Sequence, residues 1–127
     1  CWEEKGLDAS ALFMCDGSGL SPLNAVSAGF LTDLLVYMYR TEGPSGAFSR
    51  SLPLAGQEGT VASFLKNTPL AGKARIKSGS ITGVQSYSGY IEKNGGKYAF
   101  SLIINHFSGE RPTLRKTVEE LLNGLFY

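Results

Sequence analysis

Residues 74–81 have the sequence ARIKSGSI and predict a strand that lines a binding site. Ala74 and Ile76 fall on one face of this strand, and Arg75 and Lys77 fall on the other. A hydroxyl residue and a glycine follow the lysine, and a glycine lets another backbone approach closely. Such a strand suits an extended peptide with a terminal carboxylate, because the peptide adds to the strand edge while backbone N–H groups meet its carbonyl. The alternative is a basic residue that enters an ordinary turn.

Two further strands and a hairpin turn are predicted after this stretch. Residues 86–92 predict the second strand, and residues 93–96 predict a turn in which Asn94 and Gly95 supply the positive φ angles. Residues 97–107 predict the third strand, and both of its faces are largely apolar. This pattern indicates a strand that is covered on both sides.

Three helices are predicted around these strands. Ser27 caps a helix that runs to about Arg40 and ends at Gly43-Pro44. Residues 44–60 are loop-like, and Thr60 caps a short helix over residues 61–66. The last helix begins near Pro112, with an apolar face of Leu114, Val118, Leu121, Leu122 and Leu125. The order of elements predicts an α+β fold, three antiparallel strands with helices packed on the sheet.

Composition and charge exclude several classes of protein. The chain has 127 residues, of which 43% are hydrophobic and 18% charged, as in an ordinary globular domain. A net charge of +1 gives no electrostatic signal for nucleic acid. Cys1, Cys15 and a single histidine have no metal-ligand spacing, so we expect no metal. The two cysteines are either unpaired or, outside the cytosol, joined in a disulfide.

Two isolated residues, Ser18 and His106, are of types that can serve as catalytic groups. Ser18 lies between two glycines, but Asp16 stands where a G-x-S-x-G motif needs its first glycine. A tight loop that needs small residues is the favoured interpretation. His106 is the only histidine, and we interpret it as a structural residue at the end of the third strand. Residues 1–6 look like the end of a helix that starts earlier, with Gly6 as its terminating residue, so we expect a piece of a longer protein.

Several short segments together carry a family resemblance. They are DGSGLS at 16–21, LPLAG at 52–56 and KSGS at 77–80, followed by Gly83-Val84 and Ser88-Gly89-Tyr90. In this order they resemble the C-terminal part of the class C low-molecular-mass penicillin-binding proteins. These are D-alanyl-D-alanine carboxypeptidases/endopeptidases of the penicillin-binding protein 4 type, peptidase family S13. The resemblance implies that residues 1–127 are the C-terminal portion of a serine β-lactamase/transpeptidase-like domain.

The resemblance also implies roles for four residues. The family uses S-x-x-K for the nucleophile, S-x-N, and K-T-G on a strand that lines the cleft. Residues 77–79 look like the third motif, with a serine that keeps the hydroxyl of threonine. By resemblance, Lys77 and Ser78 are catalytic: Lys77 supplies positive charge and Ser78 contacts the substrate carboxylate. Gly79 and Ser80 bind substrate, and the N–H group of Ser80 is one oxyanion-hole donor.

The other two motifs are where the chain departs from the family. No Ser-x-Asn occurs, and the one S-x-x-K runs from Ser63 to Lys66. On a helix this spacing would place the lysine beside the serine, as an activated nucleophile needs. However, the family's S-x-x-K lies far upstream of K-T-G, with S-x-N between them. We therefore interpret Ser63 as part of an amphipathic turn, with Phe64 and Leu65 inward, and expect the isolated chain to be inactive.

The implied parent protein is a serine enzyme that cleaves peptidoglycan stem peptides by acyl transfer and is acylated by β-lactam antibiotics. It needs no cofactor and lies in the bacterial periplasm or cell envelope. The alternatives are a β-lactamase or esterase of the same fold, or a peptidoglycan-binding module without catalysis. The strand at 97–107 would pair with N-terminal strands in the family, so we expect a partner chain or a second copy to cover its edge here.

Overall fold

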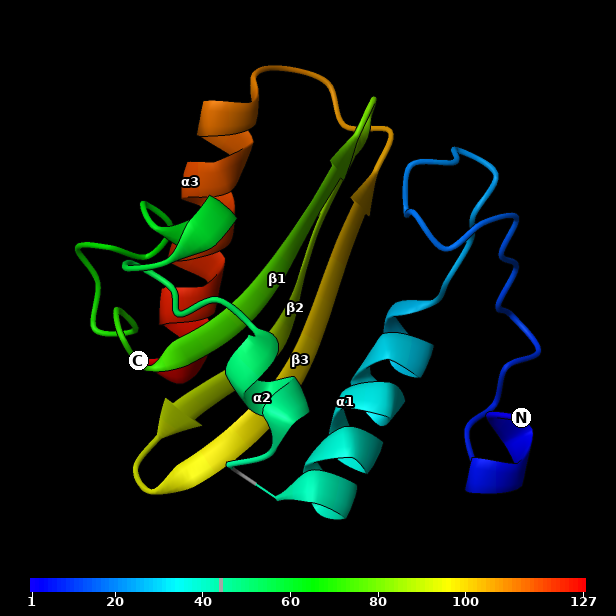
Figure 1. Ribbon diagram of the computed structural model, residues 1–127. Helices are drawn as coiled ribbons and strands as arrows, with labels where there is room; N and C mark the ends of the chain where they lie inside the picture. The colour runs from blue at the N-terminus through cyan, green and yellow to red at the C-terminus, as the bar shows by residue number, and fades with distance from the viewer. Residues whose placement is uncertain (44) are drawn as a thin grey trace.

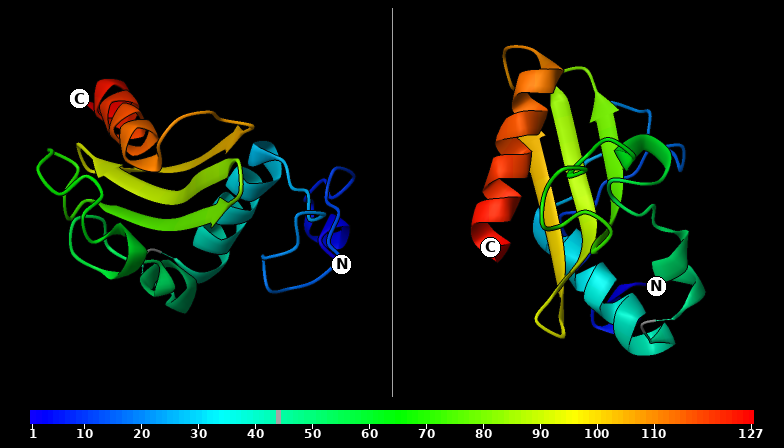
Figure 2. Two further views of the ribbon diagram at one scale, coloured as in Figure 1. Left: turned by 90° about the horizontal axis from the view of Figure 1, so that it is seen from above. Right: turned by 90° about the vertical axis from the view of Figure 1, so that its left-hand side faces the viewer.

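The fold is a three-stranded antiparallel sheet between two helices. The computed structural model describes residues 1–43 and 45–127. Strands β1 (Ala74–Ile81), β2 (Val84–Lys93) and β3 (Gly96–Asn105) lie in the order β1-β2-β3 (Figure 1). Helix α1 (Ala28–Glu42) covers one face of the sheet and α3 (Arg111–Phe126) covers the other, as the view from above in Figure 2 shows. The predicted α+β fold is therefore confirmed.

Each face of the sheet has its own core, as the alternation of side chains along a strand requires. Ile76, Tyr87 and Ile91 pack toward Val118 and Leu122 of α3. On the other face, Tyr90 packs with Leu35 of α1 and donates a hydrogen bond to its carbonyl oxygen at 2.6 Å. Strand β3 contributes to both cores, since Phe100, Leu102 and Ile104 contact the first and Ala99 the second. The prediction that this strand is covered on both sides is confirmed.

The strand register depends on two local features. Asn94 and Gly95 have φ angles of 51° and 76°, which form the predicted hairpin turn between β2 and β3. Gly89 of β2 stands opposite Ile76 of β1. A Cβ atom at position 89 would lie 1.9 Å from the carbonyl oxygen of Arg75, so only glycine lets the two strands approach this closely.

The helix ends follow the sequence signals in part. Ser27 caps α1 as predicted, because its side chain accepts a hydrogen bond from the N–H group of Phe30 at 3.0 Å. Gly43 is the C-cap of α1, while Pro44 lies outside the described residues. A short helix α2 (Ala47–Ser51) lies in the segment predicted as loop. On α3 the apolar face is narrower than predicted, since Leu121 and Leu125 are 48% and 67% exposed.

The predicted helix over residues 61–66 is wrong. The structure has a 3-10 helix, η2 (Gly59–Val61), with Glu58 instead of Thr60 at the N-cap position and no side-chain capping bond, and then a series of turns. Leu65 has a φ angle of 60°, which a right-handed helix does not allow. Phe64 and Leu65 are fully buried, so burial of both apolar side chains is achieved with a turn.

The N-terminal segment lies along the outer side of α1 (Figure 1). It begins with a 3-10 helix, η1 (Glu3–Lys5), which Gly6 ends with a φ angle of 80°. Cys1 and Cys15 are exposed and free, so the alternative of a disulfide between them is not realised. Among the described residues, no helix is long and apolar enough to cross a membrane.

Candidate active-site strand

The first half of β1 has both edges paired. On one side it pairs with β2, and on the other it meets the segment Pro53–Ala55. The N–H group of Ile76 donates to the carbonyl oxygen of Pro53 at 2.9 Å, and that of Ala55 donates to Ala74 at 2.8 Å. Arg75 strengthens this contact, since its guanidinium donates to the carbonyl oxygen of Leu52 at 2.9 Å. The segment at 52–56, one of the family-like stretches, therefore serves as a short cover for β1.

The second half of β1 has an open edge. Backbone groups in an antiparallel strand point to alternate sides, so Ser78 and Ser80 turn their N–H and C=O groups the same way as Ala74 and Ile76. Beyond Ile76, no backbone group of the described residues hydrogen-bonds to this edge. The ammonium group of Lys77 donates to the carbonyl oxygen of Ser78 at 2.6 Å, along the same edge. The stretch predicted to bind an extended peptide is thus the stretch that is free to do so.

Each of the four predicted site residues has a defined environment. Lys77 is exposed, and the Ser78 hydroxyl shares a hydrogen bond of 2.7 Å with the Thr60 hydroxyl. At Gly79 a Cβ atom would lie 2.6 Å from Oγ of Ser86, so a larger residue here would displace the Ser86 hydroxyl from its present position. The Ser80 hydroxyl donates to Oε1 of Gln85 at 2.5 Å.

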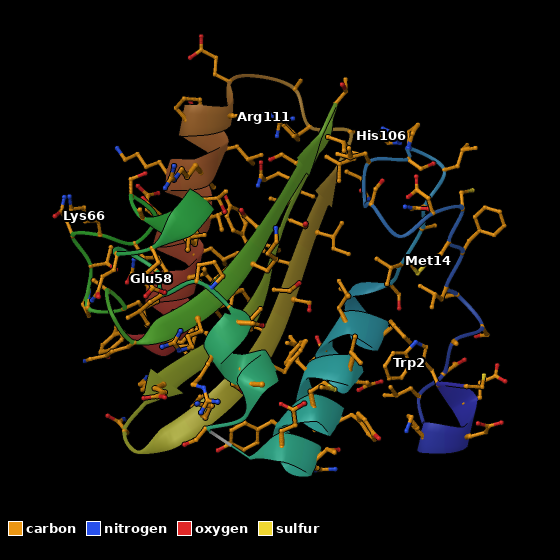
Figure 3. All side chains as sticks on the ribbon, in the orientation of Figure 1. Trp2, Met14, Glu58, Lys66, His106 and Arg111 are labelled. Atoms are coloured by element: carbon orange, nitrogen blue, oxygen red, sulfur yellow. The ribbon has the colours of Figure 1, made fainter. Side chains whose placement is uncertain are left out.

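Besides its pairing with β2, this stretch is supported by the side chains of Gln85 and Arg111, which the sequence did not single out. Gln85 is only 7% exposed, and its Nε2 donates to the carbonyl oxygen of Gly79 at 3.1 Å. Arg111 reaches from the first turn of α3 toward the ends of β1 and β2 (Figure 3). Its guanidinium donates to Gln85 Oε1 at 2.8 Å, to Ser80 Oγ at 3.2 Å and to the carbonyl oxygen of Ile81 at 2.7 Å. No sequence motif marks either residue, because their contacts depend on strand register and on where α3 packs.

Hollows lie on both faces of the open half of β1. On the α3 face, a pocket of about 430 Å³ is lined by Ser78, Ser80, Thr60 and Arg111, among others. On the α1 face, a more apolar pocket of about 510 Å³ is lined by Gly79 together with residues of α1 and of the loop after Leu12. Arg111 has no carboxylate within 4.0 Å among the described residues, so its positive charge is not neutralised by an ion pair.

Ser63, Lys66 and His106 lie in surroundings that give them no catalytic geometry among the described residues. The Ser63 hydroxyl accepts a hydrogen bond from Arg115 at 2.8 Å, and Lys66 points outward from the loop (Figure 3). Because residues 61–66 are not helical, the Ser63–Lys66 spacing does not produce the geometry of an activated serine. Its interpretation as a turn with Phe64 and Leu65 inward agrees with their burial. His106 is exposed after β3 with a φ angle of 53°.

The loop at 16–21 is stabilised by its own polar side chains. Asn24 Oδ1 accepts from the N–H group of Cys15 at 2.8 Å, and Asn24 Nδ2 donates to Asp16 at 3.1 Å. The hydrogen bond from Asn24 lowers the pKa of the Asp16 carboxyl group. The Ser18 hydroxyl accepts from the N–H group of Leu20 at 3.2 Å, as in a local turn. The structure agrees with the favoured interpretation of Ser18 as a loop residue.

Known proteins are similar to this chain in sequence and in structure. Residues 2–125 match the model of the D-Ala-D-Ala carboxypeptidase 3 (S13) family. The chain is 36% identical over 118 residues to a D-alanyl-D-alanine carboxypeptidase of Actinomadura sp. (strain R39), covering 84% of this chain and 21% of that protein. It is 31% identical over 114 residues to penicillin-sensitive carboxypeptidase A of Dictyostelium discoideum, covering 84% of this chain and 22% of that protein.

A solved structure shows the same fold. The crystal structure of penicillin-binding protein 4 (DacB) from Haemophilus influenzae matches with a TM-score of 0.89 and 28% sequence identity, covering 98% of this chain and 30% of that one. The chain thus spans about a fifth of the length of the two curated relatives.

Proposed function

Because the chain belongs to the D-Ala-D-Ala carboxypeptidase 3 (S13) family, which confirms the resemblance inferred from its sequence, we propose that it forms one part of a serine D-Ala-D-Ala carboxypeptidase/endopeptidase. In this proposal, residues 1–127 are the C-terminal portion that carries the K-T-G-like strand. The S-x-x-K and S-x-N motifs come from a preceding part of the same protein. The short share of its relatives that the chain spans supports this division.

The observation that carries the proposal is the open half of β1. Ser78 and Ser80 turn N–H groups that have no backbone partner among the described residues toward the edge on which Lys77 lies, and the Pro53–Ala55 cover stops just before them. A stem peptide can add to this edge as a further strand, with its backbone bound by main-chain groups. An ordinary basic turn residue would not require the edge to be open over this length.

The proposed reaction is acyl transfer at the penultimate D-Ala carbonyl. A serine from the preceding part attacks this carbonyl, D-Ala leaves, and water then releases the acyl group. Ser80 donates its N–H group to the developing oxyanion, and Ser78 exchanges its bond with Thr60 for one with the terminal carboxylate. Lys77 supplies positive charge beside the reacting groups. These steps use no metal or organic cofactor.

β-Lactam antibiotics are the second ligand class in the proposal, since they mimic the D-Ala-D-Ala terminus and acylate the same serine. The structure of the Haemophilus influenzae protein was also solved in complex with a β-lactam, which supports this. Peptidoglycan stem peptides lie outside the cytoplasmic membrane, so we place the protein in the bacterial periplasm or cell envelope. We also retain the prediction that the 97–107 edge is covered, by strands of the preceding part or by a second copy.

A fluorescent penicillin tests the proposal on two proteins, the 127-residue chain and the full-length gene product. Intact mass should show one adduct per full-length molecule and none on the isolated chain, whose folding circular dichroism verifies. Release of D-Ala from a stem peptide separates a carboxypeptidase from a β-lactamase or esterase. A full-length protein that folds but forms no adduct and releases no D-Ala would favour the non-catalytic module. An adduct on the isolated chain that Ser63→Ala abolishes would overturn the motif assignment.

A further inference from the structure

The peptide bond between Gly79 and Ser80 is held from one side only. The C=O of Gly79 and the N–H of Ser80 belong to the same planar peptide unit, in which they point in opposite directions. Gln85 Nε2 donates to this C=O at 3.1 Å, and Ser86 Oγ lies 3.5 Å from the same oxygen. A support that holds the C=O toward β2 therefore fixes the direction of the N–H toward the open edge.

Gln85 is itself fixed by Arg111. It is a buried polar side chain on the face that α3 covers, and both ends of its amide are hydrogen-bonded. Oε1 accepts from Arg111 at 2.8 Å and from the Ser80 hydroxyl at 2.5 Å, while Nε2 donates to Gly79. A largely buried hydrogen-bond network of this kind rigidifies the backbone that it contacts. Rotation of the Gly79–Ser80 peptide would break the bond to Nε2 and leave a buried donor unpaired.

The charge of Arg111 also makes the N–H group of Ser80 a stronger hydrogen-bond donor. Hydrogen bonds in a chain polarise one another, so a cation on Oε1 makes Nε2–H a stronger donor. A stronger bond to the Gly79 carbonyl in turn makes the N–H of Ser80 a better donor. Arg111 lies in the first turn of α3, where a positive charge is unfavourable for the helix dipole, and the acidic residue at this end is the N-cap Glu110. The helix dipole therefore gives no reason for an arginine at this position.

We propose that Gln85 and Arg111 are positioning residues that orient and polarise the Ser80 N–H group as an oxyanion-hole donor. This inference rests on the proposed function, because it assigns a purpose to the oxyanion role of Ser80. Neither residue touches the substrate; Gln85 acts through the Gly79 carbonyl, and Arg111 acts through Gln85.

The test compares variants of the full-length protein in their acylation by penicillin. Gln85→Leu should lower the acylation rate per titratable site about tenfold to hundredfold, somewhat less than deletion of an oxyanion donor itself. Arg111→Met should lower it about threefold to tenfold, and Arg111→Lys should recover most of the loss. The number of titratable sites and the non-covalent affinity should stay within about twofold of wild type, because the binding edge is unchanged. Gln57→Leu and Arg40→Met, at exposed positions, are the matched controls.

Two spectroscopic readouts separate positioning from a merely structural role. The ester carbonyl stretch of the acyl-enzyme should move to higher frequency in Gln85→Leu, because a weaker oxyanion hole polarises the carbonyl less. The Ser80 amide proton resonance should also shift in Gln85→Leu and not in Gln57→Leu. A per-site rate within twofold of wild type with an unchanged carbonyl stretch would overturn the inference.

Failure of the proposed function has a different signature. It would appear as a wild-type protein that forms no acyl-enzyme at all. The shift of the Ser80 amide resonance in Gln85→Leu, compared with Gln57→Leu, would then test whether Gln85 orients the Ser80 N–H group. If Gln85→Leu does not fold, Arg111→Met carries the test, since the Arg111 side chain is exposed.

Discussion

Both halves of β1 pair with β2 along one edge, but they differ along the other edge, which is paired in the first half and open in the second. From Ala74 to Ile76 the edge is closed by Pro53–Ala55, and the side chains of Ala74 and Ile76 are fully buried. From Lys77 to Ser80 the edge is open, and the side chains are polar and at least partly exposed. The comparison shows how one strand anchors itself in the core and still offers a template for a substrate. It also predicts that mutations in the two halves affect different measurements.

The largest expected effect is on the open half, at Lys77. In the full-length protein, Lys77→Ala should lower penicillin acylation about 10²–10³-fold, because it removes a charge near the developing oxyanion. The melting temperature should not change, since the side chain is exposed. Lys66→Ala, which removes the lysine of the Ser63–Lys66 spacing, is the control and should acylate normally. If Lys77→Ala lowered the acylation rate less than threefold, Lys77 would not be part of the proposed catalytic site.

The closed half should respond in stability instead. Ile76 is 0% exposed, so Ile76→Ala should reduce the free energy of unfolding by about 3 kcal/mol through lost burial and a residual cavity. Urea unfolding of the 127-residue chain measures this. In the full-length protein, the acylation rate per titratable site should stay close to wild type. A change below about 1 kcal/mol would show that this half of the strand is not anchored as described.

Ser78 should affect recognition more than stability. Ser78→Ala should raise KM about tenfold for a stem peptide with a free terminal carboxylate, because one charge-assisted hydrogen bond is lost. For the same peptide with a terminal amide, KM should change little. Ser78→Thr keeps a hydroxyl and serves as the conservative control. Equal effects on both peptides would mean that Ser78 does not contact the carboxylate.

The smallest expected effect concerns the cover of the closed half. Glu58 accepts a hydrogen bond from the N–H group of Leu54 at 2.8 Å and lies 3.9 Å from Arg75, with its side chain 56% exposed. Glu58→Ala should cost about 1 kcal/mol or less, since exposed charges are screened by solvent. Amide exchange at Ile76 should then become faster, while Ser78 and Ser80 exchange rapidly with or without the mutation. Unchanged exchange at Ile76 would show that Glu58 does not hold the cover in place.

Local sequence signals predicted the elements on which the comparison rests. Alternation of polar and apolar residues located the strand at 74–81, two largely apolar faces indicated the third strand, Asn94 and Gly95 located the hairpin turn, and Ser27 located the start of α1. These features depend on a few neighbouring residues, so a single sequence is sufficient to predict them. The Lys77–Ser80 stretch was recognisable for the same reason.

The supports of the site were not predictable because their partners are far apart in the sequence. Thr60 meets Ser78 across 18 residues, and Arg111 meets Gln85 across 26. Gln85 reads as an ordinary polar strand residue until the register places it opposite Ser80. The failed helix over 61–66 has a similar cause, since packing of Phe64 and Leu65 overrides local helix propensity.

Gly89 has a consequence for how sequences of this kind can vary. The close approach of β2 to the Arg75 carbonyl sets the spacing of the two strands in the middle of β1, one residue before Lys77. A saturation library selected for resistance to cell-wall stress should accept only glycine at position 89, although glycine has no side chain that could take part in the reaction. A substitution there would widen the sheet and displace the whole open edge. If only glycine is accepted at position 89, the reason is the short distance between the β1 and β2 backbones and not a chemical role in the reaction.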